Sequence, residues 1–499
     1  MTVRRRHSTP AVSETIAEAV SRTNQTIHLW IEAGIFAGCL LVLAVTATSA
    51  ANPHLSVVAA AMFFWMIVLS LRLSPRGTIL LIPFIISSAS SMVALVMIEY
   101  GAEIPELGMM GLPNGSTSTY VVYTTICFWF FLLSFNWIVG SDLRSIKQIS
   151  LLFDRYATPI ALGILAIGAL SIAYLMLAGL KSGFPLLTGA DRYAYRRFSA
   201  DIITLYLLNL KATISIILGM VSFLLPVSRL LKLASTSIFI CLSLVFFLFG
   251  EKFFTQLLSL ATFMTPYLYH NHKRLLQLLP VLLIGGGLAL VAVSTVTWFI
   301  YSNGGRENPH ATMQRLSGRM VGQGELWFLQ NQIGARVVNW DSELVEKNAR
   351  ALFVKDINLF AVREGVGPSY FSNRYAPDKI RASILRNAGS VTYAAALEAL
   401  GLAAFGWAGL ILVMIFTGGV IALSSAYLVY AIRLRSVVSC VFAMYIISAV
   451  RSYVSQGALW QIIGIYSLKW FAVIFVIELG LMLLNSALKP SAQMNYSRI

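Results

Sequence analysis

The stretch AFGWAGLILVMIFTGGVIALSSAYLVYAI, residues 404–432, contains no charged side chain. A helix needs about 20 apolar residues to cross the hydrocarbon core of a bilayer. Every backbone polar group in that core must be bonded within the protein, so only helices and closed barrels can cross it. The stretch is continuously apolar and does not alternate as a barrel strand does, which predicts a membrane-spanning helix.

Similar apolar runs recur along nearly the whole chain. They predict an all-α polytopic membrane protein with about twelve transmembrane helices. The expected spans are 28–50, 55–71, 78–99, 119–140, 158–180, 204–227, 236–249, 253–269, 276–300, 404–432, 436–450 and 464–486.

The composition excludes a soluble protein. Hydrophobic residues make up 58% of the 499 residues and charged residues only 12%, whereas soluble domains contain roughly 25% charged residues. The cysteines all lie inside apolar runs, so they predict neither a disulfide framework nor a zinc site. They are Cys39, Cys127, Cys241 and Cys440.

Basic residues occupy alternate loops, as the positive-inside rule requires. The clusters Arg4–Arg6, Arg72 with Arg76, and Arg433 with Arg435 lie on the side of the N-terminus, whereas the opposite loops 51–54 and 101–118 contain no Lys or Arg. This pattern predicts that both termini are cytoplasmic. The net charge of +16 is then mostly an orientation signal, and it does not predict a nucleic-acid partner.

This topology divides the chain into five parts. Residues 1–27 and 489–499 are cytoplasmic tails, and 28–300 hold the first nine spans with a short outer loop at 181–203. Residues 301–389 form a large outer loop, and 390–488 hold the last three spans. Apolar residues at helical spacing in LWFLQNQIGARVV (326–338) and SELVEKNARALFVKDINLFAV (342–362) predict that the large loop folds as a helical cap. A short helix is expected over 391–402.

The short outer loop contains GADRYAYRRFSAD, residues 189–201, in which Arg192 and Arg196 are four residues apart. On a helix these like charges repel unless an anion lies between them. Thr188 and Asp191 are candidate N-caps that would aim helix N–H groups at the same anion. The alternative is a basic amphipathic segment that lies on phospholipid headgroups.

The large outer loop repeats this spacing in MQRLSGRMVGQGELWF, residues 313–328, with Arg315 and Arg319. Further along lie Arg363 and Arg374, the latter among aromatic residues in GPSYFSNRYAPD. Guanidinium groups bind phosphate oxygens through two parallel hydrogen bonds, so this mixture fits a phosphorylated or lipid-pyrophosphate-linked glycan. The alternative is that these are surface arginines of a solvated cap.

A third feature is the sequence FFLFGEKFFTQLLS, residues 246–259, between two short expected spans. Helices of about 14–17 residues do not reach across a hydrocarbon core of about 30 Å, so the turn at Gly250 is expected to lie below the membrane surface. Lys252 would then be an ammonium at membrane depth, where an ionisable group is a functional candidate. Pairing of Glu251 with Lys252, or extension of Lys252 toward the surface, is the alternative.

The sequence lacks Asp-x-Asp, HExxH, P-loop and histidine-cluster motifs. We therefore expect no metal ion and no cofactor. In that case Arg and Lys side chains would stabilise the charge of any phosphate that leaves during a reaction.

Taken together, these segments resemble the Wzy-type O-antigen polymerases, which are related to the O-antigen ligases. The resemblance lies in the basic outer loop after the fifth span, a Phe-Gly-x-Lys turn, the Arg-rich large loop and a short helix ahead of the next span. The matching stretches are Gly189–Ala200, Phe249–Phe253, Arg315–Phe328, Gly367–Tyr375 and Val391–Gly409.

The resemblance implies the C-type glycosyltransferase fold and an enzyme of the bacterial inner membrane whose active site faces the periplasm. Such an enzyme transfers a glycan from undecaprenyl pyrophosphate onto a lipid-linked repeat unit, and a chain-length regulator is an expected partner. The expected substrate-binding residues are Arg192, Tyr195, Arg196, Arg197, Lys252, Arg315, Arg319, Arg363 and Arg374.

The O-antigen ligases carry a histidine ahead of the span that follows the large loop, and this chain reads NAGSVTYAAALEAL, residues 387–400, without one. This departure favours a polymerase and leaves the general base open. Glu325 and Asp191 are candidates, because a carboxylate near arginines stays ionised and can accept a proton. A ligase-like glycosyltransferase and a flippase for lipid-linked oligosaccharides are the alternative functions.

Overall fold

The computed structural model describes the following parts of the chain: residues 10–104, 107–142, 153, 155–188, 195–196, 198–251, 253–271, 308–334, 336–355, 357–378, 381–382 and 396–487. Within these parts every long element is a helix. The two strands described, β1 (Glu103–Ile104) and β2 (Met109–Met110), form a short antiparallel pair between two helices. The expected all-α architecture is confirmed at this level.

Nine helices of the described residues are long and apolar enough to cross a membrane. They are α1 (Pro10–Ala50, of which Ile27–Ala50 qualifies), α2 (His54–Leu73), α3 (Pro75–Glu99), α4 (Ser116–Asp142), α6 (Ala157–Ser182), α11 (Arg229–Leu248), α20 (Ala396–Leu434), α21 (Val437–Gln456) and α23 (Ile465–Ala487).

The expected span 204–227 is not one straight helix. It is built from α9 (Ile202–Asn209) and α10 (Lys211–Phe223), which meet at a bend of 58° and make a tenth crossing if they are counted together. The expected span 253–269 corresponds to α12 (Phe253–His270), which is not one of the nine. The expected span 276–300 lies outside the described residues, so a total of twelve stays a prediction.

Helix α20 lies at the centre of the bundle and packs along α4 and α21. Helix α10 packs in turn on α21. The expected short helix before the tenth span forms the first part of α20, from Ala396 to a break at Gly406, where φ is 72°. A Cβ at Gly406 would lie 2.5 Å from the carbonyl oxygen of Arg336, so both the left-handed backbone and the close approach require glycine. The break therefore joins α20 to the segment around Arg336.

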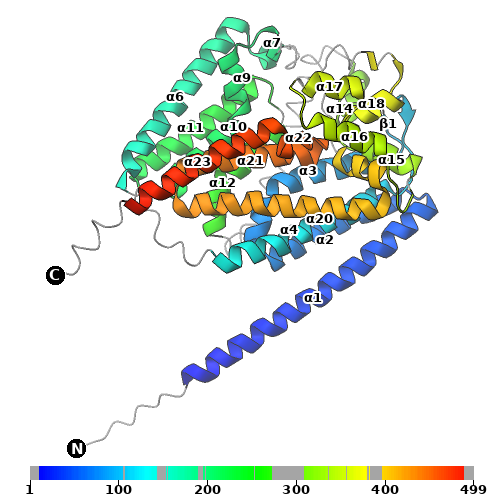
Figure 1. Ribbon diagram of the computed structural model, residues 1–499, viewed down its shortest axis with the longest axis horizontal. Coiled ribbons are helices and arrows are strands. Elements are labelled where there is room, and N and C mark those ends of the chain that lie inside the picture. Colours follow the sequence, from blue (N-terminus) through cyan, green and yellow to red (C-terminus); the bar gives the residue numbers. More distant parts are fainter. Residues whose placement is uncertain are drawn as a thin grey trace, which may run out of the picture.

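The large loop folds into helices, as its sequence predicts. These are α14 (Pro309–Val321), α15 (Glu325–Ile333), α16 (Ser342–Ala351), α17 (Ile357–Glu364) and α18 (Ser369–Tyr375), which we call the cap. Figure 1 shows the cap at the end of the bundle opposite the N and C ends of the chain. In α15, Trp327 is fully buried and its indole N–H donates to the carbonyl oxygen of Ser116, 2.8 Å away, which fixes the cap to α4.

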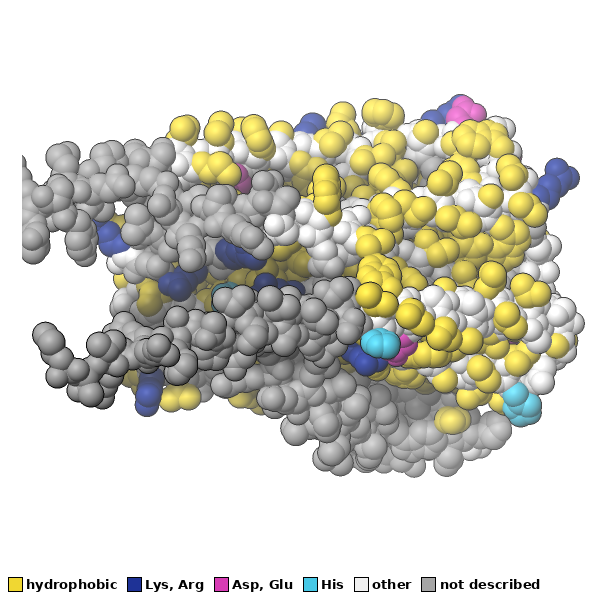
Figure 2. Space-filling view, turned by 90° about the horizontal axis from the view of Figure 1, so that it is seen from below, with side chains coloured by type: hydrophobic (Ala, Val, Ile, Leu, Met, Phe, Trp, Pro, Cys, Tyr) yellow, Lys and Arg dark blue, Asp and Glu magenta, His cyan; other side chains and the backbone are white. Residues whose placement is uncertain are grey.

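The outer surface of the bundle is apolar. In Figure 2 hydrophobic side chains cover much of the described surface, and most of the visible Lys and Arg side chains lie in the left part of the view. Arg72 in the last turn of α2 and Arg433 in the last turn of α20 belong to helix ends on the side predicted for the N-terminus. The separation of apolar and basic surface is that of a multi-pass membrane protein.

Candidate anion-binding site

The site is built around the turn between α11 and α12. After α11 the chain passes through Gly250, whose φ is 76°, and the backbone N–H of Glu251 donates to the carbonyl oxygen of Phe246. This turn folds the Glu251 side chain into the protein, where it is only 2% exposed. A carboxylate desolvated in this way needs cationic partners.

Two cations supply them from different parts of the chain. Arg196 forms an ion pair with one carboxylate oxygen of Glu251, and the Lys211 ammonium lies 2.5 Å from the other. The Arg196 and Lys211 side chains are 28% and 16% exposed. We call these three residues the buried ion cluster. It joins the short outer loop, the α9–α10 bend and the α11–α12 turn.

The packing of α10 on α12 explains why Lys211 reaches this turn. Gly219 lies so close to the α12 backbone that a Cβ there would meet the Phe263 carbonyl oxygen at 2.2 Å. Four residues further, Phe223 contacts both Phe263 and Tyr267. The two helices therefore run in parallel, and Lys211, the first residue of α10, lies near the start of α12.

Two further polar side chains belong to the same region. The guanidinium of Arg451 on α21 is close enough to the Lys211 ammonium for the two positive charges to repel each other, and the same holds for the guanidinium of Arg196. Gln256 lies in the first helical turn of α12, just after the chain leaves the turn at Gly250. The oxygen and the nitrogen of its side-chain amide are both buried without a hydrogen-bond partner among the described residues. The described groups thus comprise three cations and one carboxylate, with buried hydrogen-bonding capacity beside them. An anion with several oxygens fits this balance.

The rest of the short outer loop supports the cluster. Tyr195 was expected to bind substrate, but its ring is buried against Phe249 and its hydroxyl lies 2.7 Å from that of Ser182. Thr188 ends α7 (Pro185–Thr188) and its hydroxyl donates to the Phe184 carbonyl, and the residues that it was expected to cap lie outside the described part of the chain. The remaining expected residues of the two outer segments lie outside the described residues, and they are Asp191, Arg192, Arg197 and Lys252.

The N-cap that the sequence analysis missed is Asp201, ten residues beyond Asp191. Its carboxylate accepts from the backbone N–H of Thr204, 2.8 Å away, and from the hydroxyl of Tyr174. The hydrogen bond from Thr204 holds the pKa of Asp201 below its usual value. Asp201 thus starts α9 and ties the loop to α6.

The cap arginines have different surroundings. Arg315 and Arg319 lie one turn apart on α14, as expected, and Arg319 is exposed. Helix α14 packs on α3 and β1. Arg363 lies in the last turn of α17 and Arg374 in the last turn of α18. No described contact joins Arg363 or Arg374 to the buried ion cluster, so a single site that includes them stays a prediction.

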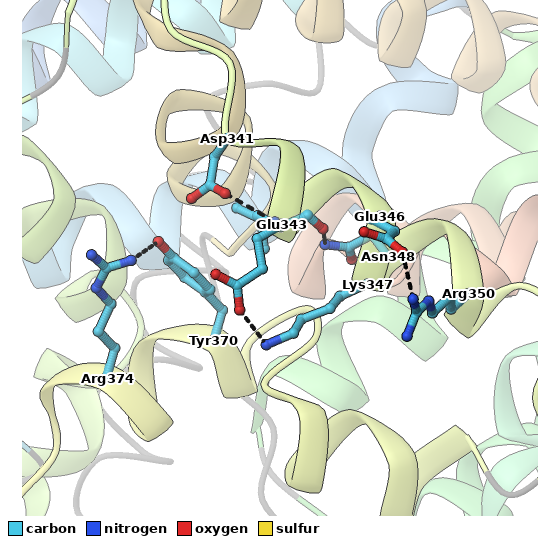
Figure 3. Close-up of polar contacts among 9 residues, drawn as sticks. Asp341, Glu343, Glu346, Lys347, Asn348, Arg350, Tyr370 and Arg374 are labelled. Atoms are coloured by element: carbon cyan, nitrogen blue, oxygen red, sulfur yellow. Dashed lines mark hydrogen bonds and ion pairs between the residues drawn. The ribbon is translucent and has the colours of Figure 1, made fainter.

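Arg374 lies beside Tyr370 at the surface of the cap (Figure 3). Its guanidinium donates to the Tyr370 hydroxyl at 2.7 Å and lies 5.7 Å from the ring centre of Tyr370 and 5.8 Å from that of Tyr375. Burial raises the pKa of the Tyr370 phenol. On the neighbouring helix α16, Glu343 pairs with Lys347 at 2.7 Å, and this hydrogen bond lowers the pKa of the Glu343 carboxyl. The arrangement is an arginine with aromatic faces at the surface.

Two buried carboxylates remain. Glu325, a candidate base, is the first residue of α15 and is only 1% exposed. Glu398, which the sequence analysis did not single out, is buried in the first part of α20, and its Oε2 has no hydrogen-bond partner among the described residues. The short helix predicted there was correct, but helical spacing alone does not show that Glu398 points inward.

Comparison with known proteins adds one finding. A family of unknown function (DUF6418) matches residues 364–471, from the end of α17 to the first part of α23. The match includes Arg374, Glu398 and Arg451 and does not include the buried ion cluster. No curated protein and no solved structure matches the chain.

Proposed function

We propose that this protein is a polysaccharide polymerase of the bacterial inner membrane. It transfers a glycan from undecaprenyl pyrophosphate onto a lipid-linked repeat unit at the periplasmic face. The observation that carries the proposal is the buried ion cluster, in which Arg196 and Lys211 converge on Glu251 with Arg451 nearby. These cations are the group to which we assign the donor pyrophosphate.

The reaction places specific demands on such a site. A hydroxyl oxygen of the acceptor sugar bonds to the anomeric carbon of the donor glycan, and the bond from that carbon to the pyrophosphate oxygen breaks. The electron pair leaves with the lipid pyrophosphate, and the hydroxyl proton passes to a basic group. Cations that are fixed before the reaction stabilise the charge that develops on the leaving oxygen.

In this proposal Glu251 orders the cations. Without a carboxylate between them, Arg196 and Lys211 would repel each other in a poorly solvated place. With it, both side chains keep one position while part of their hydrogen-bonding capacity remains for an anion, since a guanidinium has five N–H donors and an ammonium three. Arg196 and Lys211 also retain some exposure, which gives a ligand access.

The acceptor glycan is assigned to the cap. Arg374 with Tyr370 and Tyr375 offers a cation and aromatic faces at the surface, and sugars stack on such faces while their acidic groups pair with arginine. Glu325 remains our candidate for the base that accepts the hydroxyl proton. A protein that regulates chain length remains a proposed partner.

The direct test is an assay of the purified protein in liposomes with one substrate, the lipid-pyrophosphate-linked repeat unit. Polymerisation predicts a ladder of longer lipid-linked glycans. Repeat units of unchanged length would overturn the proposal.

Arginine variants test the assignment of the pyrophosphate. Arg196→Lys keeps the charge but loses the planar pair of donors, so we expect at least about a tenfold loss of ladder formation. Arg350→Lys on α16 is the matched control, because Arg350 is exposed and its ion pair in the described part of the chain is with Glu346 on its own helix. Wild-type rates in Arg196→Lys would remove the cluster from the reaction.

One observation favours a second candidate, a transporter for lipid-linked oligosaccharides. The bend between α9 and α10 puts Lys211 at the start of a half-helix, and transporters use such broken helices to bind charged substrates. In the same liposomes a transporter would move the lipid-linked repeat unit to the other leaflet and leave its length unchanged. The length of the glycan therefore decides between the two functions.

A further inference from the structure

The end of α15 and the segment that leads from it to α16 expose apolar side chains, although they belong to the polar outer loop. Val337 and Val338 are each 71% exposed and Trp340 is 67% exposed, with Ile333 exposed beside them. A single exposed apolar residue is ordinary, but a contiguous apolar patch marks a surface that is covered by something. We call these four side chains, Ile333, Val337, Val338 and Trp340, the apolar edge of the cap.

The apolar edge is fixed to the break in α20. The backbone N–H of Ala408 donates to the Val337 carbonyl at 2.9 Å, and the N–H of Asp341 donates to the Ala404 carbonyl at 3.0 Å. The side-chain amide of Asn339 donates to the Ala403 carbonyl at 2.9 Å. Backbone groups on both sides of Gly406 are thereby satisfied. The apolar edge therefore has a fixed position along the spanning helix α20.

Its surface continues that of the spanning helix. Beyond the break, α20 exposes Leu412, Phe416 and Leu423 on its outside, which are the residues expected to face lipid. Trp340 packs on Phe405 with ring centres 5.5 Å apart, directly before the break. The apolar edge therefore continues the lipid-facing surface of α20 past the break at Gly406, on the side of the cap.

The length of α20 gives the depth of the edge. From Trp407 to Arg433 the helix is about 39 Å long at about 1.5 Å per residue. A bilayer with its headgroup regions is about 40–45 Å thick. Arg433 near one surface of the membrane puts Trp407, and with it Val337, near the other. Tryptophan at this depth and Arg336 beside it are the residue types that anchor proteins in the interface.

A second contact point has the same form. At the end of α16 the carbonyl of Leu352 accepts from the backbone N–H of Ile465, the first residue of α23, and Phe353 next to it is exposed. The first turns of α23 expose Tyr466 and Trp470. The cap thus presents apolar residues at the starts of two spans.

We propose that the cap rests in the bilayer: Ile333, Val337, Val338, Trp340 and Phe353 insert into the interface of the leaflet on the cap side, and phospholipid covers them. The cap would then be held at a fixed height above the membrane at two points. Exposure of the apolar edge and its continuity with α20 carry this inference, which does not depend on the proposed reaction.

The test uses a fluorescent probe on single cysteines. Val337→Cys is introduced into full-length protein in which the four native cysteines are replaced by Ala or Ser, labelled with bimane and reconstituted in phosphatidylethanolamine–phosphatidylglycerol liposomes. The matched control is Glu346→Cys on α16, whose side chain is 62% exposed and pairs with Arg350 on the same helix. Both positions are at the surface, so neither substitution disturbs the core.

Lipid insertion predicts that brominated phospholipids quench the probe at residue 337 several-fold more than the probe at residue 346, and that iodide in the buffer does the reverse. Equal quenching by iodide at both positions would overturn the proposal. Protection of residue 337 from both quenchers would also overturn it, because a protein surface, such as a second copy of this chain, would then cover the edge.

Discussion

Arg196 and Arg374 each lie next to a tyrosine in an outer segment of the sequence, yet the protein gives them opposite surroundings. Arg196 meets a carboxylate that is 2% exposed, at the turn between α11 and α12. Arg374 lies at the surface of the cap on the rings of Tyr370 and Tyr375. A charge interaction strengthens as water is removed, so one arginine is part of a desolvated cluster and the other is screened.

The comparison shows that the burial of the partner, more than the arginine spacing, decides what an arginine contributes. Removing one member of a buried pair leaves a charge without compensation, whereas exposed pairs contribute little. The variants Glu251→Gln and Arg374→Ala test the buried and the exposed side of this contrast, and Glu346→Gln measures the small stability change expected of an exposed ion pair.

The largest effect is expected for Glu251→Gln. The amide keeps the size of the side chain but removes the charge between Arg196 and Lys211, which then repel each other. We expect the free energy of unfolding to fall by about 3 kcal/mol, at the lower end of the range for buried pairs because both cations keep some exposure. Thermal unfolding in detergent micelles measures it. An unchanged melting temperature would mean that water or lipid headgroups already compensate the cations.

Much of the fold could be predicted from the sequence because the bilayer sets the length of each apolar run. For the same reason the sequence did not reveal that Lys211 belongs to the site. Lys211 lies inside IITLYLLNLKATISIILGM, residues 202–220, and one charge in such a run is compatible with an unbroken span. The bend at Leu210 has no glycine or proline at the break to mark it.

The partner of Arg196 could not be predicted for a related reason. Glu251 is 55 residues away from Arg196 and 40 from Lys211, and sequence spacing predicts only neighbours on one element. Its place beside Lys252 suggested a local pair, but Lys252 lies outside the described residues, and the turn at Gly250 carries the Glu251 carboxylate inward to Arg196 and Lys211. The spacing of Arg196 from Arg192 predicted that Arg196 binds an anionic ligand. In this structure Arg196 pairs with a carboxylate of the protein itself, and binding of a ligand there stays a prediction.

An intermediate effect is expected for Arg374→Ala, and it tests the other side of the contrast. Loss of the guanidinium above two tyrosine rings should lower the free energy of unfolding by about 0.5–1 kcal/mol, as for exposed cation–π contacts. Tyr370→Phe is the control that removes only the hydroxyl acceptor. If Arg374 binds the acceptor glycan, ladder formation in the liposome assay falls far more in Arg374→Ala than this stability change explains. Parallel small losses in both variants would make Arg374 a structural surface residue.

The smallest effect is expected for Glu346→Gln on α16, which sets the scale against which Glu251→Gln is compared. Glu346 pairs with Arg350 one turn away at 2.5 Å, and both side chains are more than 60% exposed. Such pairs contribute about 0.3–0.5 kcal/mol, and salt near 1 M screens even that. The melting temperatures of Glu346→Gln and wild type should therefore differ slightly in dilute buffer and coincide in high salt. Because Glu251 is shielded from solvent, the deficit of Glu251→Gln should persist in the same high salt. If the two variants instead lost their deficits together, the cluster at Glu251 would be as accessible to ions as the surface of the cap, and the difference between the two regions would disappear.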